Sequence, residues 1–402
     1  PGSHSIPETT FTQIPTASSW PAKNCGQPEW KVIPLQMTTP TNKNAHITSS
    51  KLDALVRRIF VFNGLPDDHA EIAAHALVKA SLRGVDSHGV ARVPMYCERL
   101  RRKVTNPIPE ITVTRVAPAV AQVDGDNGLG LVVGNRAMNE AIAIAKEFGI
   151  GLAGVKRSGH YGMAALYILQ AIEADCIGMA FTNASPAMAV WGGRQQFLGT
   201  SPFAAGAPSG SGPPFLVDMA CSVVARGKLK FAAQRGEPIP EGFALDKDGR
   251  PTTDGQAAFE GVVLPFGGVK GSALSMLMEV LSGVLTGAAF GGEVRNPFTG
   301  LDGFQGTGHF FMALKADAFM PLAQFKDRMD TLSTRVRTQP PAQGIEQIFM
   351  PGEPEALTES DRSQKGIPLT PDVVASLEAE AALAGISADS LCSSFKQIDR
   401  NH

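Results

Sequence analysis

The residues between Asp86 and Arg92 place an acid/base group and a fixed cation within one short stretch. Imidazole titrates nearest to neutral pH, so His88 is suited to exchange a proton with a substrate. Arg92 stays charged and can hold a carboxylate through two parallel hydrogen bonds. The stretch therefore predicts a site that binds and protonates a small anionic substrate. The alternative is that His88 only packs or caps the chain beside Gly89.

Polar clusters also follow several predicted strands further along the chain. Because ligands commonly bind where strands end, these clusters are a second candidate site. Taken singly, Asn183, Thr200 and Ser201 are typical turn residues, but five such clusters within about sixty residues favour a site. The clusters lie at 158–162 (with His160), 182–183, 191–193, 199–202 and 218–220.

A third candidate is the run 264–271, in which Lys270 stands at the start of a predicted helix behind two glycines. Glycines let a ligand approach the backbone, and a helix start with a lysine suits a phosphate. The alternative is a solvated lysine.

The glycines at 128, 130 and 134 resemble a dinucleotide loop only superficially. Their spacing is GxGxxxG, whereas a dinucleotide loop has GxGxxG and an acidic residue about twenty positions later. The end of the next strand offers Val155, Lys156 and Arg157 instead. We interpret these glycines as turn and helix-packing residues.

Hydrophobic periodicity predicts two helices before the His88 stretch, one from Ser49 to Asn63 and one from Pro66 to Gly84. A third helix is expected over 90–102. β-branched runs then start a mixed sheet flanked by helices. Strands are expected at 111–116, 120–123, 150–155, 176–182, 204–207, 215–219 and 309–314, helices at 135–148, 163–174, 271–285, 319–336 and 371–384, and loop at 233–256.

Composition narrows the possible partners. The chain has 402 residues, of which 43% are hydrophobic, and a formal charge of -2, so no general attraction to nucleic acid or to an anionic membrane is expected. No apolar run approaches the ~20 residues of a membrane helix. The five cysteines lack CxxC spacing. We expect a cytoplasmic protein with no metal site.

The motifs, taken in order, resemble the malate/L-lactate dehydrogenase family of the non-Rossmann type, over about residues 49–370. That family also contains ureidoglycolate, sulfolactate and diketogulonate oxidoreductases and the ketimine reductases. The resemblance rests on SHG at 87–89 with Arg92, SGHYG at 158–162, TNASPAMAVWGG at 182–193, GTSP at 199–202, VDMA at 217–220, LPFGGVKG at 264–271 and PGE at 351–353.

The resemblance implies an α/β (α+β) fold in which a mixed, largely antiparallel sheet binds NAD(P) and a helical lobe is built from both ends of the chain. Residues 1–48 are rich in Pro, Thr, Ser and Asn and lack periodicity, so we expect a disordered extension there. The predicted division then continues with a helical part (49–110), the NAD(P)-binding sheet domain (111–316), a second helical part (317–390) and a tail (391–402).

Site residues also follow from the resemblance. It implies that His88 is the proton donor or acceptor, that Ser87 supports it, that Arg92 and Thr200 bind substrate, and that His160 shares the acid/base and nicotinamide-pocket roles. The implied cofactor contacts are Ser158, His160, Asn183, Phe215, Leu216, Val217, Asp218, Met219, Ala220, Lys270, Gly352 and Glu353. Three departures from the family pattern, Ser201, Cys221 and Lys228, bear on pocket polarity and substrate branch.

We therefore predict an oxidoreductase that uses NAD or NADP to interconvert a small 2-hydroxy acid and its 2-oxo acid, and that forms a homodimer as the family does. Lys228 favours this branch, whereas LPFGGVKGSALSM is closer to the ketimine reductases, which remain the alternative. A Ser-His hydrolase is a remote alternative, because no GxSxG elbow exists and adjacent Ser87 and His88 are not expected to pair.

Overall fold

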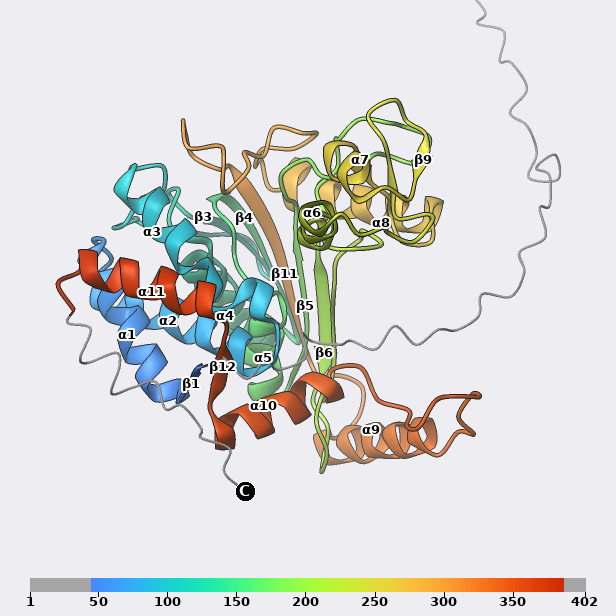
Figure 1. Cartoon of the computed structure of the whole chain (residues 1–402). Coiled ribbons are helices and arrows are strands. Elements are labelled where there is room, and N and C mark those ends of the chain that lie inside the picture. The colour runs from blue at the N-terminus through green and yellow to red at the C-terminus, as the bar shows by residue number, and fades with distance from the viewer. Residues whose placement is uncertain (1–44, 387–402) are drawn as a thin grey trace, which may run out of the picture.

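A computed structural model describes residues 45–386, and Figure 1 shows three groups of elements around one large sheet. The first group holds the helices α1 (Ser49–Phe62), α2 (Asp67–Leu82), α3 (Val93–Arg101) and α11 (Pro371–Leu383). The predicted apolar stripe of α1, from Leu52 to Phe60, is buried. It contributes to a core shared by these four helices and the start of α4.

The two ends of the described chain meet in this group. Strand β1 (Ala45–Ile47) pairs antiparallel with β12 (Ile367–Leu369), and α11 packs against α1 and α3. Regular structure was expected from Ser49, but β1 lies before it, because β12 supplies a partner strand that local sequence does not reveal. Most of the expected N-terminal extension and tail lies outside the described residues. The division into domains stays a prediction.

The large sheet has seven strands in the order β2-β3-β4-β11-β5-β6-β7. Only β3 and β4 run parallel, so the expected mixed, largely antiparallel sheet is confirmed. The strands are β2 (Thr112–Ala117), β3 (Val120–Asp124), β4 (Ile150–Ser158), β5 (Cys176–Thr182), β6 (Phe203–Ala207), β7 (Phe215–Met219) and β11 (Thr307–Lys315).

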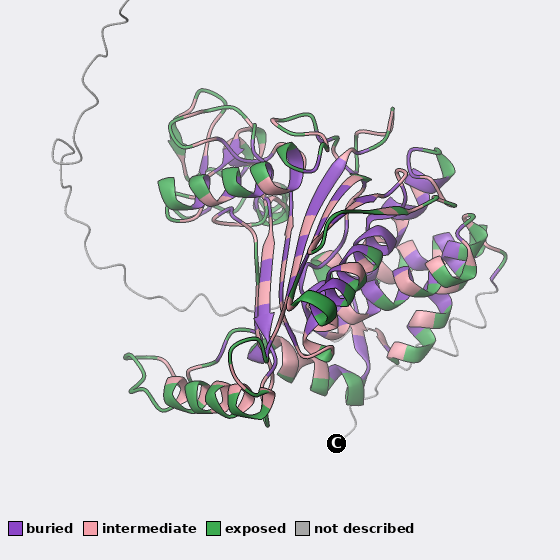
Figure 2. Cartoon of the chain, turned by 180° about the vertical axis from the view of Figure 1, so that it is seen from behind, coloured by how far each residue is buried: buried purple, intermediate pink, exposed green. Residues whose placement is uncertain are grey.

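Helices α4 (Gly130–Phe148) and α5 (Ala165–Glu173) cover one face of this sheet, where the second core lies. The central strands are mostly buried in Figure 2. Glycines permit the close packing: a Cβ on Gly151 would lie 2.0 Å from the Ala141 carbonyl oxygen of α4. On the other face, a π-helix (Val280–Val284) contacts β4, β5 and β11.

The third group contains α6 (Arg226–Arg235), α7 (Gly255–Glu260), α8 (Val269–Glu279) and a small sheet of β8 (Ala244–Leu245), β9 (Pro251–Thr252) and β10 (Val262–Val263). The expectation of loop over 233–256 is largely confirmed, since regular structure there is limited to the end of α6, the strands β8 and β9 and the start of α7. The strands here are two residues long, too short for a visible period. Helix α6 buries only Leu229 and Ala232, so its apolar stripe is faint.

Two helix starts also differ from the prediction. The helix expected over 90–102 is interrupted at its start: Asp86–His88 and Val90–Arg92 are separate 3-10 turns, since Gly89 between them is extended. Helix α4 begins at Gly130, inside the glycine run, where a Cβ would lie 2.2 Å from the Gly159 carbonyl oxygen. These glycines thus serve close packing, as interpreted from their spacing.

Two helices complete the C-terminal part. Helix α10 (Glu353–Lys365), which periodicity did not reveal because it is mostly polar, packs against α2. Helix α9 (Leu322–Arg337) has no buried residue and lies apart from the helical group in Figure 1. Its Asp330 accepts hydrogen bonds from the backbone of Gly210 and Ser211, in the β6–β7 turn.

Candidate active site

The His88 turn is held from two sides. Arg362 of α10 donates to the Asp86 carboxylate at 2.6 Å and fixes the start of the turn. Gly89 fits against α2, where a Cβ would fall 2.1 Å from the Ser81 hydroxyl oxygen, and that hydroxyl accepts from the Val90 amide at 3.1 Å. The short turns are therefore a scaffold that fixes the direction of the His88 side chain.

Ser87 links His88 and Arg92, the two residues predicted to act on the substrate. Its hydroxyl lies 3.0 Å from Nδ1 of His88. Its carbonyl oxygen accepts a hydrogen bond from Nε of Arg92 at 2.6 Å. The predicted pair of histidine and arginine is thus one rigid unit. Ser87 and His88 were expected to have difficulty pairing as nucleophile and base; the 3-10 turn nevertheless brings the two side chains into hydrogen-bonding distance.

His160 joins this unit from the end of β4. Its ring stacks on that of His88 with centroids 5.6 Å apart and planes at 15°. Its backbone amide donates to Oε1 of Gln305 at 2.9 Å. The Tyr96 hydroxyl of α3 lies 2.6 Å from its Nδ1. The two histidines that sequence left as alternatives for the proton therefore lie in one site.

Electrostatics set the protonation of this cluster. Burial, and then the neighbouring Arg92 charge, lowers the pKa of His88 to about 4. Burial and then His88 hold the pKa of His160 well below its usual value, while burial raises the pKa of the Tyr96 phenol. At neutral pH Tyr96 therefore keeps its proton. The Gly162 amide donates to Nδ1 of His160 at 3.4 Å, so this nitrogen is an acceptor and the Tyr96 hydroxyl donates a hydrogen bond to it. The His160 proton then resides on Nε2.

A second chain of hydrogen bonds crosses the sheet behind this cluster. His309 on β11 is fully buried, with Nε2 2.8 Å from the Ser158 hydroxyl and Nδ1 2.7 Å from the Thr182 hydroxyl. The Tyr161 ring stacks on it at 4.6 Å. Burial lowers the pKa of His309 to about 3, so this imidazole is neutral. These hydrogen bonds join β4, β5 and β11 next to His160.

The strand-end clusters gather at one end of the sheet. Thr182 pairs with His309 across β5 and β11, and Phe203 pairs with Met219 across β6 and β7. Thr200 lies at the same end of the sheet, because its carbonyl oxygen accepts a hydrogen bond from the Cys221 amide at 2.8 Å. The ends of β4, β5 and β7 and the start of β6 thus meet at the edge that carries His160.

The predicted cofactor residues on β7 run down the sheet from that edge. Asp218 is exposed and accepts from the Ala165 amide, at the start of α5, at 2.8 Å. Leu216 lies further down, where its amide donates to the Pro351 carbonyl, next to Gly352. The buried Glu353 carboxylate accepts from Nε of Arg337 at 3.1 Å. Residues 215–220 and 352–353 therefore do come together.

Two residues predicted to contact the cofactor, Asn183 and Lys270, differ in their surroundings from the cofactor residues on β7. Asn183 is buried, with Nδ2 donating to the Ala289 carbonyl at 2.6 Å and Oδ1 accepting from the Gly308 amide at 3.0 Å, so its side chain already binds backbone. Lys270 is exposed at the start of α8, and among the described contacts none joins it to the His88 cluster. Its role in the site stays a prediction.

Sequence reasoning did not assign roles to several residues of the site. Tyr96 had a signal, because it shares a helical face with Arg92 and Arg99. Gln305 and Phe298 had none: they come from the loop before β11, and the Phe298 ring lies 4.8 Å from the Arg92 guanidinium carbon. Such contacts depend on tertiary structure alone.

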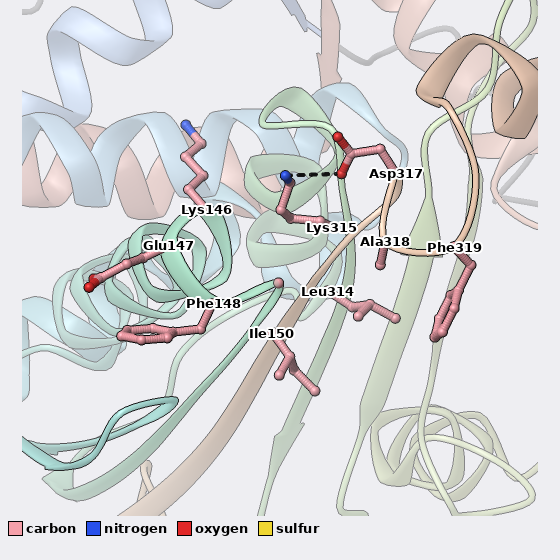
Figure 3. A pocket seen from close by; sticks show the side chains of 10 residues that line it. Lys146, Glu147, Phe148, Ile150, Leu314, Lys315, Asp317, Ala318 and Phe319 are labelled. Atoms are coloured by element: carbon pink, nitrogen blue, oxygen red, sulfur yellow. Dashed lines mark ion pairs between the residues drawn. The ribbon is translucent and has the colours of Figure 1, made fainter.

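A hollow of the surface lies at the opposite end of the sheet (Figure 3). Its lining consists of residues 146–150, 314–315 and 317–319, and Lys315 pairs there with Asp317 at 3.2 Å. It contains none of the predicted site residues.

In the described part of the chain, no helix is both long and apolar enough to cross a membrane.

Known proteins resemble this chain over nearly its whole described length. Malate dehydrogenase of Pyrococcus horikoshii is 38% identical over 85% of this chain and 96% of its own. Ureidoglycolate dehydrogenase (NAD+) of Escherichia coli K12 is 32% identical over 83% and 95%. (2R)-3-Sulfolactate dehydrogenase (NADP+) of Chromohalobacter salexigens is 38% identical over 62% and 75%.

Solved structures of such dehydrogenases, and of a reductase, also resemble this chain. Sulfolactate dehydrogenase from Methanocaldococcus jannaschii superposes with a TM-score of 0.81 at 36% identity, covering 86% of this chain and 98% of that one. Delta1-piperideine-2-carboxylate reductase from Pseudomonas syringae pvar. tomato has a TM-score of 0.74 at 28% identity, with 84% and 99% covered. The sequence profile of malate/L-lactate dehydrogenase matches residues 47–378. The chain therefore belongs to the malate/L-lactate dehydrogenase family, as its motifs predicted, and is a dehydrogenase.

Proposed function

We propose that this protein interconverts a small 2-hydroxy acid and its 2-oxo acid with NAD or NADP as cofactor. The observation that carries the proposal is the coupling of His88 and Arg92 through Ser87, whose hydroxyl and carbonyl contact the two side chains at 3.0 and 2.6 Å. A proton-transfer group and a carboxylate anchor held at a fixed separation suit a substrate whose reacting carbon adjoins its carboxylate.

Each residue then has a definite task. When bound, the nicotinamide supplies or accepts the hydride at the carbon next to the carboxylate. Arg92 binds the carboxylate through its two terminal nitrogens, since its Nε is already bound to Ser87. His88 exchanges the proton with the substrate oxygen through Nε2, because Nδ1 contacts Ser87. His160, with its proton on Nε2, donates a hydrogen bond that orients the nicotinamide or the substrate oxygen.

The chain's residues fit a dinucleotide. Helix α8 begins without an acidic residue in its first turn, behind Gly267 and Gly268, both at positive φ, and Lys270 there is exposed. A helix start of this kind favours phosphate. Asp218 is exposed at the end of β7, where a carboxylate can accept from ribose hydroxyls. Ser158 and Lys270 remain proposed contacts.

The alternative is reduction of a ketimine acid, supported by the likeness to the piperideine-carboxylate reductase structure. Arg92 would act unchanged, and His88 would protonate the developing amine. A hydrolase built on the Ser87–His88 contact is disfavoured, because the chain belongs to a dehydrogenase family.

We also propose that the protein forms a homodimer. Helix α8 and the π-helix expose apolar side chains at helical spacing, namely Val269 57%, Met276 45%, Leu277 47%, Val280 50% and Val284 53%. Such a contiguous apolar face is typical of a protein interface. Light scattering of Met276→Glu with Val280→Glu tests this: a monomer supports it, and an unchanged mass contradicts it. In the part of the chain that the structure describes, Cys97, Cys176 and Cys221 are buried free thiols, which suits the reducing cytoplasm.

One panel of substrates separates the proposed activities. We would follow oxidation of NADH and of NADPH with small 2-oxo acids, with the same acids plus methylamine, and with cyclic imino acids. The proposal expects turnover of a 2-oxo acid alone. Turnover only in the presence of the amine, or only of cyclic imines, would establish the ketimine reductase instead.

A further inference from the structure

The loop 295–305, between the π-helix and β11, contacts both functional groups of the site. Its Phe298 ring lies 4.8 Å from the guanidinium carbon of Arg92, and Oε1 of Gln305 accepts the His160 amide at 2.9 Å. In Figure 1 the orange loops that precede β11 lie at the end of the sheet beside α3. Two residues of the loop, Phe298 and Gln305, therefore contact the candidate site.

Hydrogen bonds within the loop fix the backbone beneath Phe298. The Asn296 side-chain oxygen accepts from the amides of Phe298 at 2.9 Å and Thr299 at 3.2 Å. The Arg295 amide donates to the Gln305 carbonyl at 3.0 Å and closes the loop. A turn closed in this way holds the ring position with little freedom.

Arg99 ties this loop to α3. Its side chain is buried, and it donates to the carbonyl oxygens of Gly300 at 3.1 Å, of Pro297 and Gly303 at 3.4 Å, and of Val104 at 3.0 Å. Burying a charge is costly unless its hydrogen bonds are satisfied. Three of these carbonyls, those of Pro297, Gly300 and Gly303, belong to the loop, so Arg99 holds the loop against α3.

The ring of Phe298 completes the restraint of Arg92. Nε of Arg92 is bound to the Ser87 carbonyl, and the ring lies against the guanidinium. Among the described residues no carboxylate pairs with Arg92, and its surroundings keep the charge desolvated. An aromatic face stabilises such a cation and excludes water from one side of it. The terminal nitrogens remain available for a ligand.

We propose that Phe298 is a positioning residue that sets the affinity of Arg92 for the substrate carboxylate. This inference rests on the proposed function, in which Arg92 binds that carboxylate. The aromatic face holds the guanidinium plane so that both terminal nitrogens meet the carboxylate. Leucine would retain an apolar cover but no aromatic face, whereas tryptophan would retain the face.

The test measures KM and kcat separately for the preferred 2-oxo acid. Phe298→Leu should raise KM by about three- to thirty-fold, the loss expected for a cation–aromatic contact, with kcat and cofactor affinity close to those of the wild type. Phe298→Trp should keep KM near the wild-type value. Phe304→Leu is the matched control, since Phe304 lies on the same loop and is 45% exposed against 50% for Phe298.

A double variant separates this inference from the proposed function. If Phe298 acts through Arg92, Phe298→Leu should cost nothing further in the Arg92→Gln background. Suppose that Arg92→Gln impairs acid binding. An unchanged KM in Phe298→Leu, or equal effects of Phe298→Leu and Phe304→Leu, would then overturn the inference and leave the proposed function intact. If Arg92→Gln itself leaves kcat/KM for acids intact, the proposed carboxylate site fails instead.

Discussion

The hydroxyl of Tyr96 lies 2.6 Å from Nδ1 of His160, and this contact decides which nitrogen of His160 carries the proton. Burial raises the pKa of Tyr96, so the phenol keeps its proton, and the Gly162 amide, which donates to the same Nδ1 at 3.4 Å, identifies that nitrogen as an acceptor. His160 therefore presents an N–H at Nε2 toward the site. His88, stacked on it, has its own Nδ1 on Ser87. The two histidines thus differ in their hydrogen-bond partners, although both lie in one candidate site.

Replacing Tyr96 by phenylalanine should free His160 to adopt the other tautomer. We expect kcat to fall by about three- to ten-fold, the value of one hydrogen bond, in both reaction directions. Tyr167→Phe is the matched control, because that buried tyrosine donates only to the Tyr161 carbonyl at 2.6 Å. Equal loss of kcat in both variants would show that Tyr96 has only a structural role.

His88→Ala should lower kcat by about 10²–10⁴-fold, because the variant lacks the group that exchanges the substrate proton. Cofactor affinity, measured by fluorescence of the bound reduced nicotinamide, should stay near the wild-type value. His75→Ala, on the exposed side of α2, serves as the control. Turnover within a factor of a few of the wild type would assign the proton to His160.

The cofactor site is tested by two variants with opposite expected effects. Lys270→Ala should weaken binding of NADH or NADPH, since it removes a cation from the start of α8. Gly130→Ala should lower the free energy of unfolding, because its Cβ would collide with the Gly159 carbonyl 2.2 Å away. Nicotinamide fluorescence and urea denaturation measure the two quantities. The reverse pattern would place the dinucleotide at the glycines of residues 128–134.

Acid should destabilise the protein through its buried histidines. His309 has a pKa of about 3 when folded, against about 6.5 in an unfolded chain, so the unfolded state binds the extra proton. Stability is therefore full above pH ~6.5 and is lost as the pH falls toward 3. In His309→Gln the slope between pH 4 and 6 should decrease by up to about 1.4 kcal/mol per pH unit.

Urea denaturation at a series of pH values measures that slope. An NMR titration of the His309 ring in the wild type provides a second measurement if the variant folds poorly. A His309 ring that titrates near 6.5 would contradict the prediction.

Local patterns explain how much of the fold the sequence revealed. The apolar stripe from Leu52 to Phe60 has helical spacing, and the β-branched runs are typical of strands. The helices and strands predicted from these patterns therefore lie close to their observed bounds. His88 and Arg92 were found because they are neighbours in sequence. In contrast, β1 was not predicted because it pairs with β12, which is distant in the sequence. Helix α10 was not predicted because its residues show little apolar periodicity.

The rest of the site depends on contacts between distant segments. Tyr96 meets His160, and Phe298 meets Arg92, only because α3, β4 and the loop before β11 converge. Asn183 illustrates the opposite problem. A polar residue at a strand end looks the same in sequence whether it binds a ligand or, as its side chain does here, the backbone of Ala289 and Gly308.

The proposed recognition of an acid by Arg92 is tested most directly by comparing kcat/KM for a 2-oxo acid and for its neutral amide in the wild type and in Arg92→Lys. Lysine keeps the charge but loses the paired nitrogens. We predict that kcat/KM for the acid falls by about thirty-fold, corresponding to ~2 kcal/mol, while the poor activity on the amide is unchanged. Equal kcat/KM values for acid and amide, unaffected by Arg92→Lys, would contradict a carboxylate site at Arg92.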